Sequence, residues 1–119
     1  MIKKINIYES YFNDLEKLMD QEDSKEFEIK NAAAKVAKID NDKEFKENLK
    51  KFYENIYTVE KFNKEKYMMV VELDELIHMI LISLRLLNLV NTDCYSYYKM
   101  VSKEISSYYK TMYRIFRRG

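Results

Sequence analysis

Histidine and cysteine are the side chains that most often build metal and nucleophilic sites, and this sequence of 119 residues has one of each, His78 and Cys94. Metal sites made from these residues need three or four ligands, so one chain cannot supply such a site. Glu75 and His78 form a Glu-x-x-His motif. Di-iron helical bundles use that motif twice, together with two further glutamates, so only a symmetric dimer could complete the set. The sequence therefore predicts no metal and no cofactor.

A nucleophilic Cys94–His78 pair would require the two side chains to meet in space. They stand 16 residues apart, with a predicted helix end between them. No basic residue directly flanks Cys94 to lower the pKa of its thiol. A small buried cysteine is the better interpretation, and the sequence predicts no catalytic residue and no enzymatic activity.

Four polar residues of the largely apolar segment 64–90 stand out by their spacing: Asp74, His78, Arg85 and Asn88. At 100° per residue they fall within one narrow stripe of a helix. Two interpretations stay open. The stripe is either the solvent-facing seam of this helix, or a partly buried polar network that fixes its register or receives a partner.

The C-terminal segment concentrates positive charge. Residues 94–119 carry six basic residues and one acidic residue, a net charge of +5, whereas the rest of the chain carries 15 basic and 19 acidic residues, a net charge of −4. Five of the six fall within about 60° on a helical wheel, which we call the basic stripe, and tyrosines including Tyr95 flank it. The predicted partner-binding residues are Lys99, Lys103, Tyr109, Lys110, Tyr113, Arg114, Arg117 and Arg118.

The main expectation for this stripe is an acidic protein surface, and the alternative is nucleic-acid phosphate. Favourable interaction with the helix dipole explains basic residues in the last turns only, and like charges four residues apart are mildly destabilising. A plain solvated face is the simplest interpretation of the stripe and stays open beside both of these partners. A helix-turn-helix reader over 31–50 is disfavoured, because its turn lacks glycine and its second helix begins with Glu44 and Glu47.

The fold class follows from residues that are nearly absent. The chain has one glycine and no proline. Such a chain can hardly form the many tight turns of a β-sandwich or barrel, and it has no glycine-rich phosphate loop. A hydrophobic content of 47% suffices for a core. We expect one all-α domain over 1–119, a left-handed up-down bundle of four to five helices around an apolar central helix at about 64–90.

Apolar residues three and four apart place the helices. Asp23 and Glu26 should cap the second helix, and the polar clusters 40–42 and 91–93 should begin the helices that follow them. The expected inward residues are Ile5, Tyr8, Phe12, Leu15 and Met19 in the first helix; Phe27, Ile29, Ala33, Val36 and Ile39 in the second; Phe45, Leu49, Phe52, Ile56 and Val59 in the third; and Cys94, Tyr98, Val101, Ile105, Tyr108, Met112 and Phe116 in the last.

The cellular setting is predicted from further features of the sequence. A single cysteine cannot form an internal disulfide, which favours the reducing cytoplasm. The longest apolar stretch, 76–90, is too short and too polar to cross a membrane, and the first residues do not resemble a signal peptide. The bias towards Lys, Asn, Ile, Tyr and Glu is typical of AT-rich genomes and suits a phage- or plasmid-encoded inhibitor or regulator. A homodimer through the fourth or fifth helix is left open.

Overall fold

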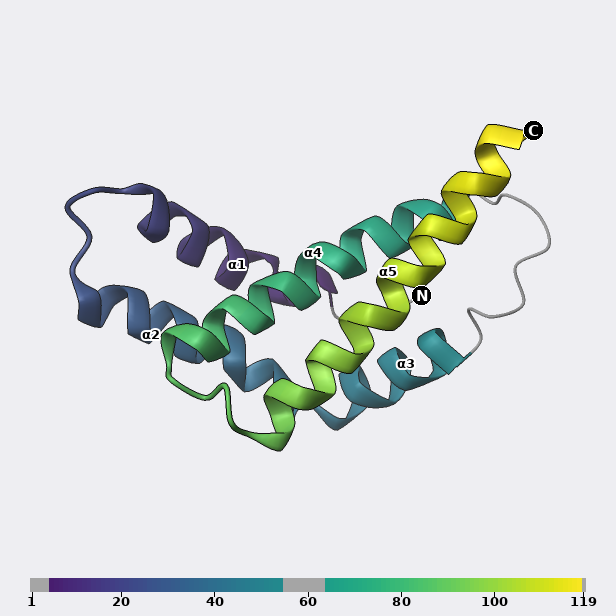
Figure 1. The fold of residues 1–119 in the computed structure, drawn as a ribbon. Helices are drawn as coiled ribbons and strands as arrows, with labels where there is room; N and C mark the ends of the chain where they lie inside the picture. Colours follow the sequence, from purple (N-terminus) through teal and green to yellow (C-terminus); the bar gives the residue numbers. More distant parts are fainter. Residues whose placement is uncertain (1–4, 55–63, 119) are drawn as a thin grey trace.

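The computed structural model describes residues 5–54 and 64–118 and is helical almost throughout (Figure 1). The predicted all-α bundle is confirmed, with five α-helices and no strand in the described ranges. The left-handed sense of the packing stays a prediction. The elements are α1 (Ile5–Asp20), α2 (Glu26–Ala37), a 3-10 turn η1 (Lys38–Asn41), α3 (Lys43–Glu54), α4 (Lys64–Leu86) and α5 (Asp93–Arg118).

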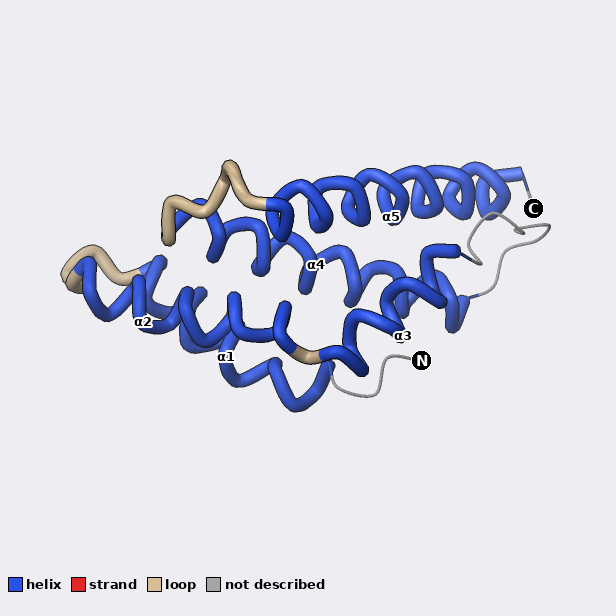
Figure 2. Tube along the Cα trace, turned by 90° about the horizontal axis from the view of Figure 1, so that it is seen from below, coloured by secondary structure: helices blue, strands red, loops and turns tan. Residues whose placement is uncertain are grey.

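Helix α4 lies at the centre, as its composition predicts. It packs against α5 on one side and against α2 and α1 on the other (Figure 2). Val70, Ile77 and Ile80 are fully buried, and the buried Ser83 donates its hydroxyl proton to the Met79 carbonyl oxygen at 2.8 Å. Because α4 is covered on several sides, it can be apolar over most of its circumference.

Helix α2 approaches its neighbours through small side chains. Ala32 and Ala33 are buried where α2 packs against α1 and α4. Phe27 was expected to face inward, but that prediction is wrong, because this side chain is 60% exposed. Phe27 precedes the buried Ala33 by six residues, which places the two side chains about 120° apart around the helix.

The last turn of α1 departs from its predicted face in a similar way. Met19 is 44% exposed, although Phe12 and Leu15 on the same face are buried. Met19 stands at the end of the helix, beyond the turns that the core covers. The predicted inward residues Ile56 and Val59 lie outside the described residues.

Two of the predicted helix starts are confirmed by caps. Asp42 Oδ1 accepts a hydrogen bond from the Phe45 amide at 3.1 Å, and Thr92 Oγ1 accepts one from the Tyr95 amide at 3.2 Å. The second oxygen of Asp42 accepts the hydroxyl proton of Tyr8, which ties α1 to the start of α3.

The predicted Asp23–Glu26 capping pair is wrong. The residue that precedes α2 is Lys25, in an extended conformation, and no side chain caps the helix there. Because the helix begins at Glu26 itself, Asp23 stands too early in the chain to reach the free amides of the first turn.

The end of α4 shows how a chain without internal glycine reverses direction. Asn88 has a φ of 58°, which is left-handed, and among the described residues other than glycine it alone has a positive φ. The Leu89 amide donates to the Leu84 carbonyl at 2.8 Å and the Asn88 amide donates to the Arg85 carbonyl at 3.0 Å, which is the Schellman motif. Helix α4 therefore ends at Leu86, earlier than the predicted Val90.

Asn88 should be sensitive to substitution for this reason. Asn88→Ala is expected to lower the free energy of unfolding by about 1 kcal/mol, because alanine tolerates the left-handed region poorly, whereas Asn88→Gly should preserve stability or raise it. Denaturant unfolding followed by circular dichroism measures both. Asn91→Ala in the same loop is the control and should change stability by less than about 0.5 kcal/mol. Equal stability of the two variants at position 88 would contradict this role.

Candidate protein-binding face on helices α4 and α5

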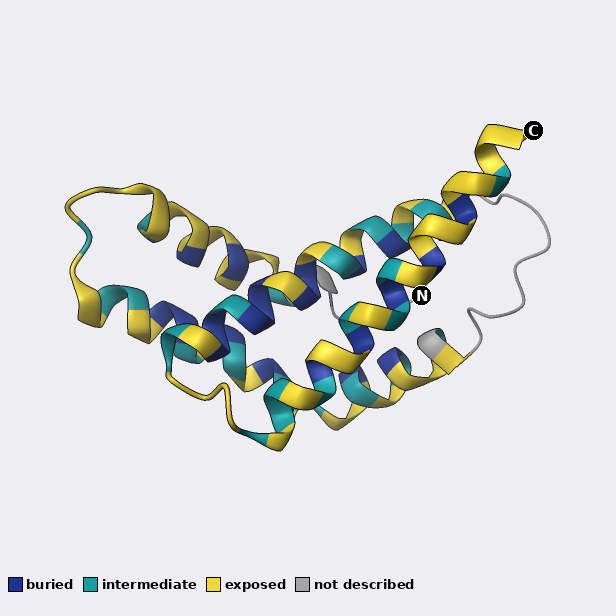
Figure 3. Ribbon diagram, viewed as in Figure 1, coloured by how far each residue is buried: buried dark blue, intermediate teal, exposed yellow. Residues whose placement is uncertain are grey.

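Helix α5 separates an apolar side from a basic side as far as Met112. The prediction that Phe116 also faces inward is wrong, because this side chain is 57% exposed. One side buries Tyr98, Val101 and Ile105 against the core, and the other side is open to solvent (Figure 3). All six basic side chains of α5 are exposed. Within the described residues, no carboxylate lies at ion-pair distance from any of them. The predicted stripe is therefore a row of uncompensated cations on a helix that the core holds in place.

A tyrosine from α4 joins the predicted tyrosines of α5. The ring of Tyr67 stacks on that of Tyr109, with centroids 5.3 Å apart, and the Tyr67 hydroxyl donates to the Tyr109 hydroxyl at 3.0 Å. That hydrogen bond, followed by desolvation, raises the pKa of Tyr67. Tyr109 and Tyr113 remain 38% and 45% exposed. The pair fixes the aromatic flank of the basic stripe to the start of α4.

The polar stripe of α4 faces solvent. The side chains of His78 and Asp74 are 58% and 39% exposed, and His78 Nδ1 lies 2.7 Å from the Asp74 carbonyl oxygen and 3.4 Å from Asp74 Oδ1. Arg85 is also exposed. Asn88 does not belong to the helix stripe, because it stands in the turn after α4. These three residues of α4 therefore form a largely exposed stripe in which Asp74 is half-buried, and whether the stripe receives a partner stays a prediction.

Arg85 connects the polar stripe to α5. Its Nε donates to the Tyr95 hydroxyl at 3.0 Å, and its guanidinium lies 5.9 Å from the centre of the Tyr95 ring. Lys99 Nζ lies 6.0 Å from the centre of the same ring. One tyrosine of α5 thus carries a cation from each helix.

These contacts bring the two predicted constellations onto one surface. Tyr67, Asp74, His78 and Arg85 fall within about 40° on α4. Because the first and last of them contact Tyr109 and Tyr95, the two between them lie along the same edge of α4, beside α5. We call this edge, together with Tyr95, Tyr109, Tyr113 and the basic stripe, the α4–α5 face. Tyr67 was not predicted to belong to this face. Its spacing could have shown this, because it stands seven residues, or nearly two turns, before Asp74 and so lies on the same side of the helix.

Negative charge gathers on the other side of α4. A groove of about 320 Å³ runs between α1 and α4, and four glutamates line it above an apolar floor that includes Phe12 and Met79. These glutamates are Glu9, Glu16, Glu72 and Glu75. Glu75 therefore faces a different surface from the basic stripe. No group of three potential metal ligands occurs in the described part of the chain.

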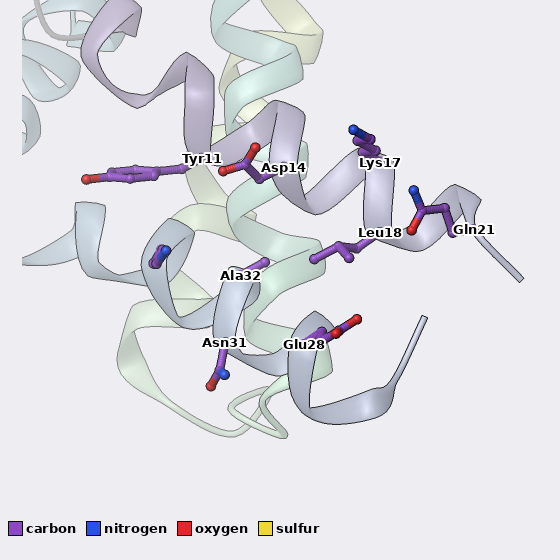
Figure 4. Close-up of a pocket in the computed structure, with 9 residues that line it drawn as sticks. Tyr11, Asp14, Lys17, Leu18, Gln21, Glu28, Asn31 and Ala32 are labelled. Carbon is purple, nitrogen blue, oxygen red and sulfur yellow. The ribbon is translucent and has the colours of Figure 1, made fainter. Parts of the chain in front are cut away.

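A second groove, of about 490 Å³, lies between α1 and α2. Its lining mixes both charges, with Asp14 and Glu28 against Lys17 and Lys35. Figure 4 shows the labelled side chains spread along two helices, with Leu18 directed towards α2, rather than converging on one point. This arrangement favours no particular ligand.

Cys94 lies in a small polar cluster under the start of α5. Burial, followed by a hydrogen bond to the Asp40 carboxylate, raises the pKa of the half-buried Cys94 thiol to about 12. Lys46 Nζ pairs with Asp40 Oδ1 at 3.1 Å. The fully buried Tyr98 hydroxyl has no well-directed hydrogen bond among the described residues, and its pKa is raised by burial and by Asp40. This environment holds the thiol protonated, the opposite of what a nucleophile needs.

The Cys94–His78 pair is also separated in space. Helices α4 and α5 run antiparallel, with Arg85 beside Tyr95. His78 therefore stands about 10 Å further along α4 than the part that adjoins Cys94.

Comparison with known proteins adds no precedent for this face: no family model, no curated protein and no solved structure matches the chain. None of the helices in the described residues combines the length and apolar character needed to cross a bilayer. The face is therefore interpreted from its own chemistry.

The raised pKa of Cys94 makes a measurable prediction. At pH 8 the native thiol should react with iodoacetamide at least about 100-fold more slowly than the thiol of the urea-unfolded protein, since the native thiolate fraction is far smaller. The rate follows from mass spectrometry of the alkylated chain. Asp40→Asn removes the carboxylate that disfavours the thiolate and should speed the native reaction. Equal rates in the native and unfolded protein would contradict the assignment.

Proposed function

We propose that this chain is a non-enzymatic interaction protein that binds an acidic protein surface through the basic, tyrosine-flanked side of α5. Binding would inhibit or regulate that partner. The observation that carries the proposal is the row of exposed basic side chains with no carboxylate partner among the described residues.

Energetics support a functional origin for the row. Lys99 and Lys103, and likewise Lys110 and Arg114, are four residues apart, and such like-charge pairs cost a few tenths of a kcal/mol each in a helix. An acidic partner would relieve this repulsion and would be attracted from a distance, which raises the association rate. Arginine and tyrosine are also among the residues that contribute most often to binding energy at protein interfaces.

The proposed setting is the cytoplasm of a host cell, with the protein encoded by a phage or plasmid. Support for this setting is compositional: one cysteine, and a strong bias towards the residues of AT-rich genomes. A small rigid bundle that offers one charged face is suited to blocking a partner, because binding then needs little ordering of the chain.

Nucleic acid is the second candidate partner, since phosphates also bind a row of lysine and arginine side chains. Phosphate binding releases counterions, so its affinity would fall steeply with salt concentration. A salt titration with short DNA and RNA duplexes and single strands distinguishes this candidate. Little or no gel shift at low salt would exclude it.

Charge reversal tests the main proposal. In the variant K103E/K110E/R114E, recovery of the native partner in an affinity pull-down from the host should fall at least about tenfold, because three attractive contacts become repulsive. Circular dichroism should show unchanged helicity, since all three side chains are exposed.

The matched control is K17E/K35E/K38E, which makes the same change in net charge on exposed positions of α1, α2 and η1. This variant should recover the partner as well as the native protein does. Equal recovery by the two triple variants would reject the basic side of α5 as the contact.

A further inference from the structure

We infer that the partner segment is an acidic helix, and that it lies lengthwise on the α4–α5 face with its carboxylates received by the Tyr95 and Tyr109 hydroxyls. This inference rests on the proposed function and adds two claims to it. The contact includes the Arg85 end of α4 as well as α5, and the partner presents its acidic side chains at helical spacing.

The hydroxyls of Tyr95 and Tyr109 can each donate a hydrogen bond to a carboxylate of the partner. The Tyr95 oxygen accepts from Arg85 Nε, and the Tyr109 oxygen accepts from the Tyr67 hydroxyl. A hydroxyl carries one donor besides its acceptor sites, so each of these two keeps its own proton to donate. Accepting a hydrogen bond polarises a hydroxyl and makes it a better donor, and a carboxylate is the acceptor that gains most from this.

A helical partner matches the spacing of the two hydroxyl-bearing residues. Tyr95 and Tyr109 are 14 residues apart on one straight helix, about 21 Å. Basic side chains stand near both ends of this span, with Lys99 beside Tyr95 and Lys110 next to Tyr109. Acidic residues placed 14 apart on a second helix lie on one face of it at the same distance, with room for others every three or four residues between them.

The middle of the face allows a helix to come close. Between the two tyrosines, α5 presents the short side chains Ser102 and Ser106, both half-buried. A partner backbone can therefore approach α5 there, while the long basic side chains reach around it.

The rings themselves argue against a nucleic-acid strand. Proteins that bind single strands stack bases on open aromatic faces. Here Tyr67 covers one face of Tyr109, and the cations of Arg85 and Lys99 lie over the Tyr95 ring. What the two tyrosines offer a partner is their hydroxyl groups, which suit carboxylates.

The experiment uses two peptide probes and one oligonucleotide against the full chain. The first peptide is an alanine-based helix of about 21 residues with glutamates at i, i+4, i+7, i+11 and i+14. The second has the same composition with its glutamates distributed around the helix, and the third probe is oligothymidylate of similar charge. Fluorescence anisotropy at about 100 mM salt should show the first peptide binding at least about fivefold more tightly than either other probe. Equal affinity of the two peptides, or tighter binding of the oligonucleotide, would overturn the inference.

Variants then test the α4 contribution. Y95F/Y109F removes both hydroxyls but keeps the rings, and R85Q removes the α4 cation. Each should weaken the first peptide about tenfold and leave the second unchanged, as expected when a hydrogen bond to a charged group is lost. Tyr11→Phe, at an exposed tyrosine of α1, is the matched control and should have no effect.

The outcomes separate this inference from the proposed function. If R85Q and Y95F/Y109F bind like the native protein while K103E/K110E/R114E loses the partner, the two-helix face is wrong and the basic side of α5 stands. A second copy of the chain could also offer its acidic groove to this face. A dimer in light scattering that dissociates in E9K/E16K would assign the face to self-association and overturn the inference.

Discussion

The packing of α5 against α4 determines where polar side chains can lie on this side of the molecule. Helix α4 buries residues such as Val70, Ile77 and Ile80 against its neighbours, so α5 must turn its own apolar side inward to cover them. Because Tyr98, Ile105 and Met112 point into the core, the basic residues on the opposite side of α5 must face solvent. The uncompensated row of cations is therefore a consequence of core packing as much as of sequence. Rotating α5 to hide the charges would expose the core.

The reversal between these helices is made without glycine. Asn88 takes the left-handed position that glycine usually occupies, and the Leu84 and Arg85 carbonyls are satisfied by the turn that follows. Because the turn is tight, α5 returns directly along α4, and Tyr95 meets Arg85 at its first turn. With so little glycine, the surfaces that this molecule can offer a partner are the sides of its helices. The tight turn after α4 determines which sides of α4 and α5 lie next to each other.

Much of this fold could be predicted from apolar spacing, because that spacing records which side of each helix loses contact with water. Leu15, Val36, Leu49 and Ile105 were all placed correctly in this way. Phe27 was not, because it lies about 120° around α2 from the buried Ala33 and is 60% exposed. The Asp23 cap failed for a different reason: backbone conformation at Lys25 decides where the helix begins, and residue type alone does not specify it.

In the candidate site, too, some features follow from the spacing within one helix and others depend on how two helices pack. The exposure of the six basic residues could be predicted, since it follows from the period of one helix. Two features depended on the rotation of α4 relative to α5, which no single helix encodes: the stacking of Tyr67 on Tyr109 and the hydrogen bond between Arg85 and Tyr95. That rotation also sets the order of charge around the bundle, with the basic stripe on one side of α4 and the groove of four glutamates on the other. An acidic helix drawn to α5 would be repelled by that groove if it strayed across α4, so the same packing that exposes the cations also limits how a partner can lie on them.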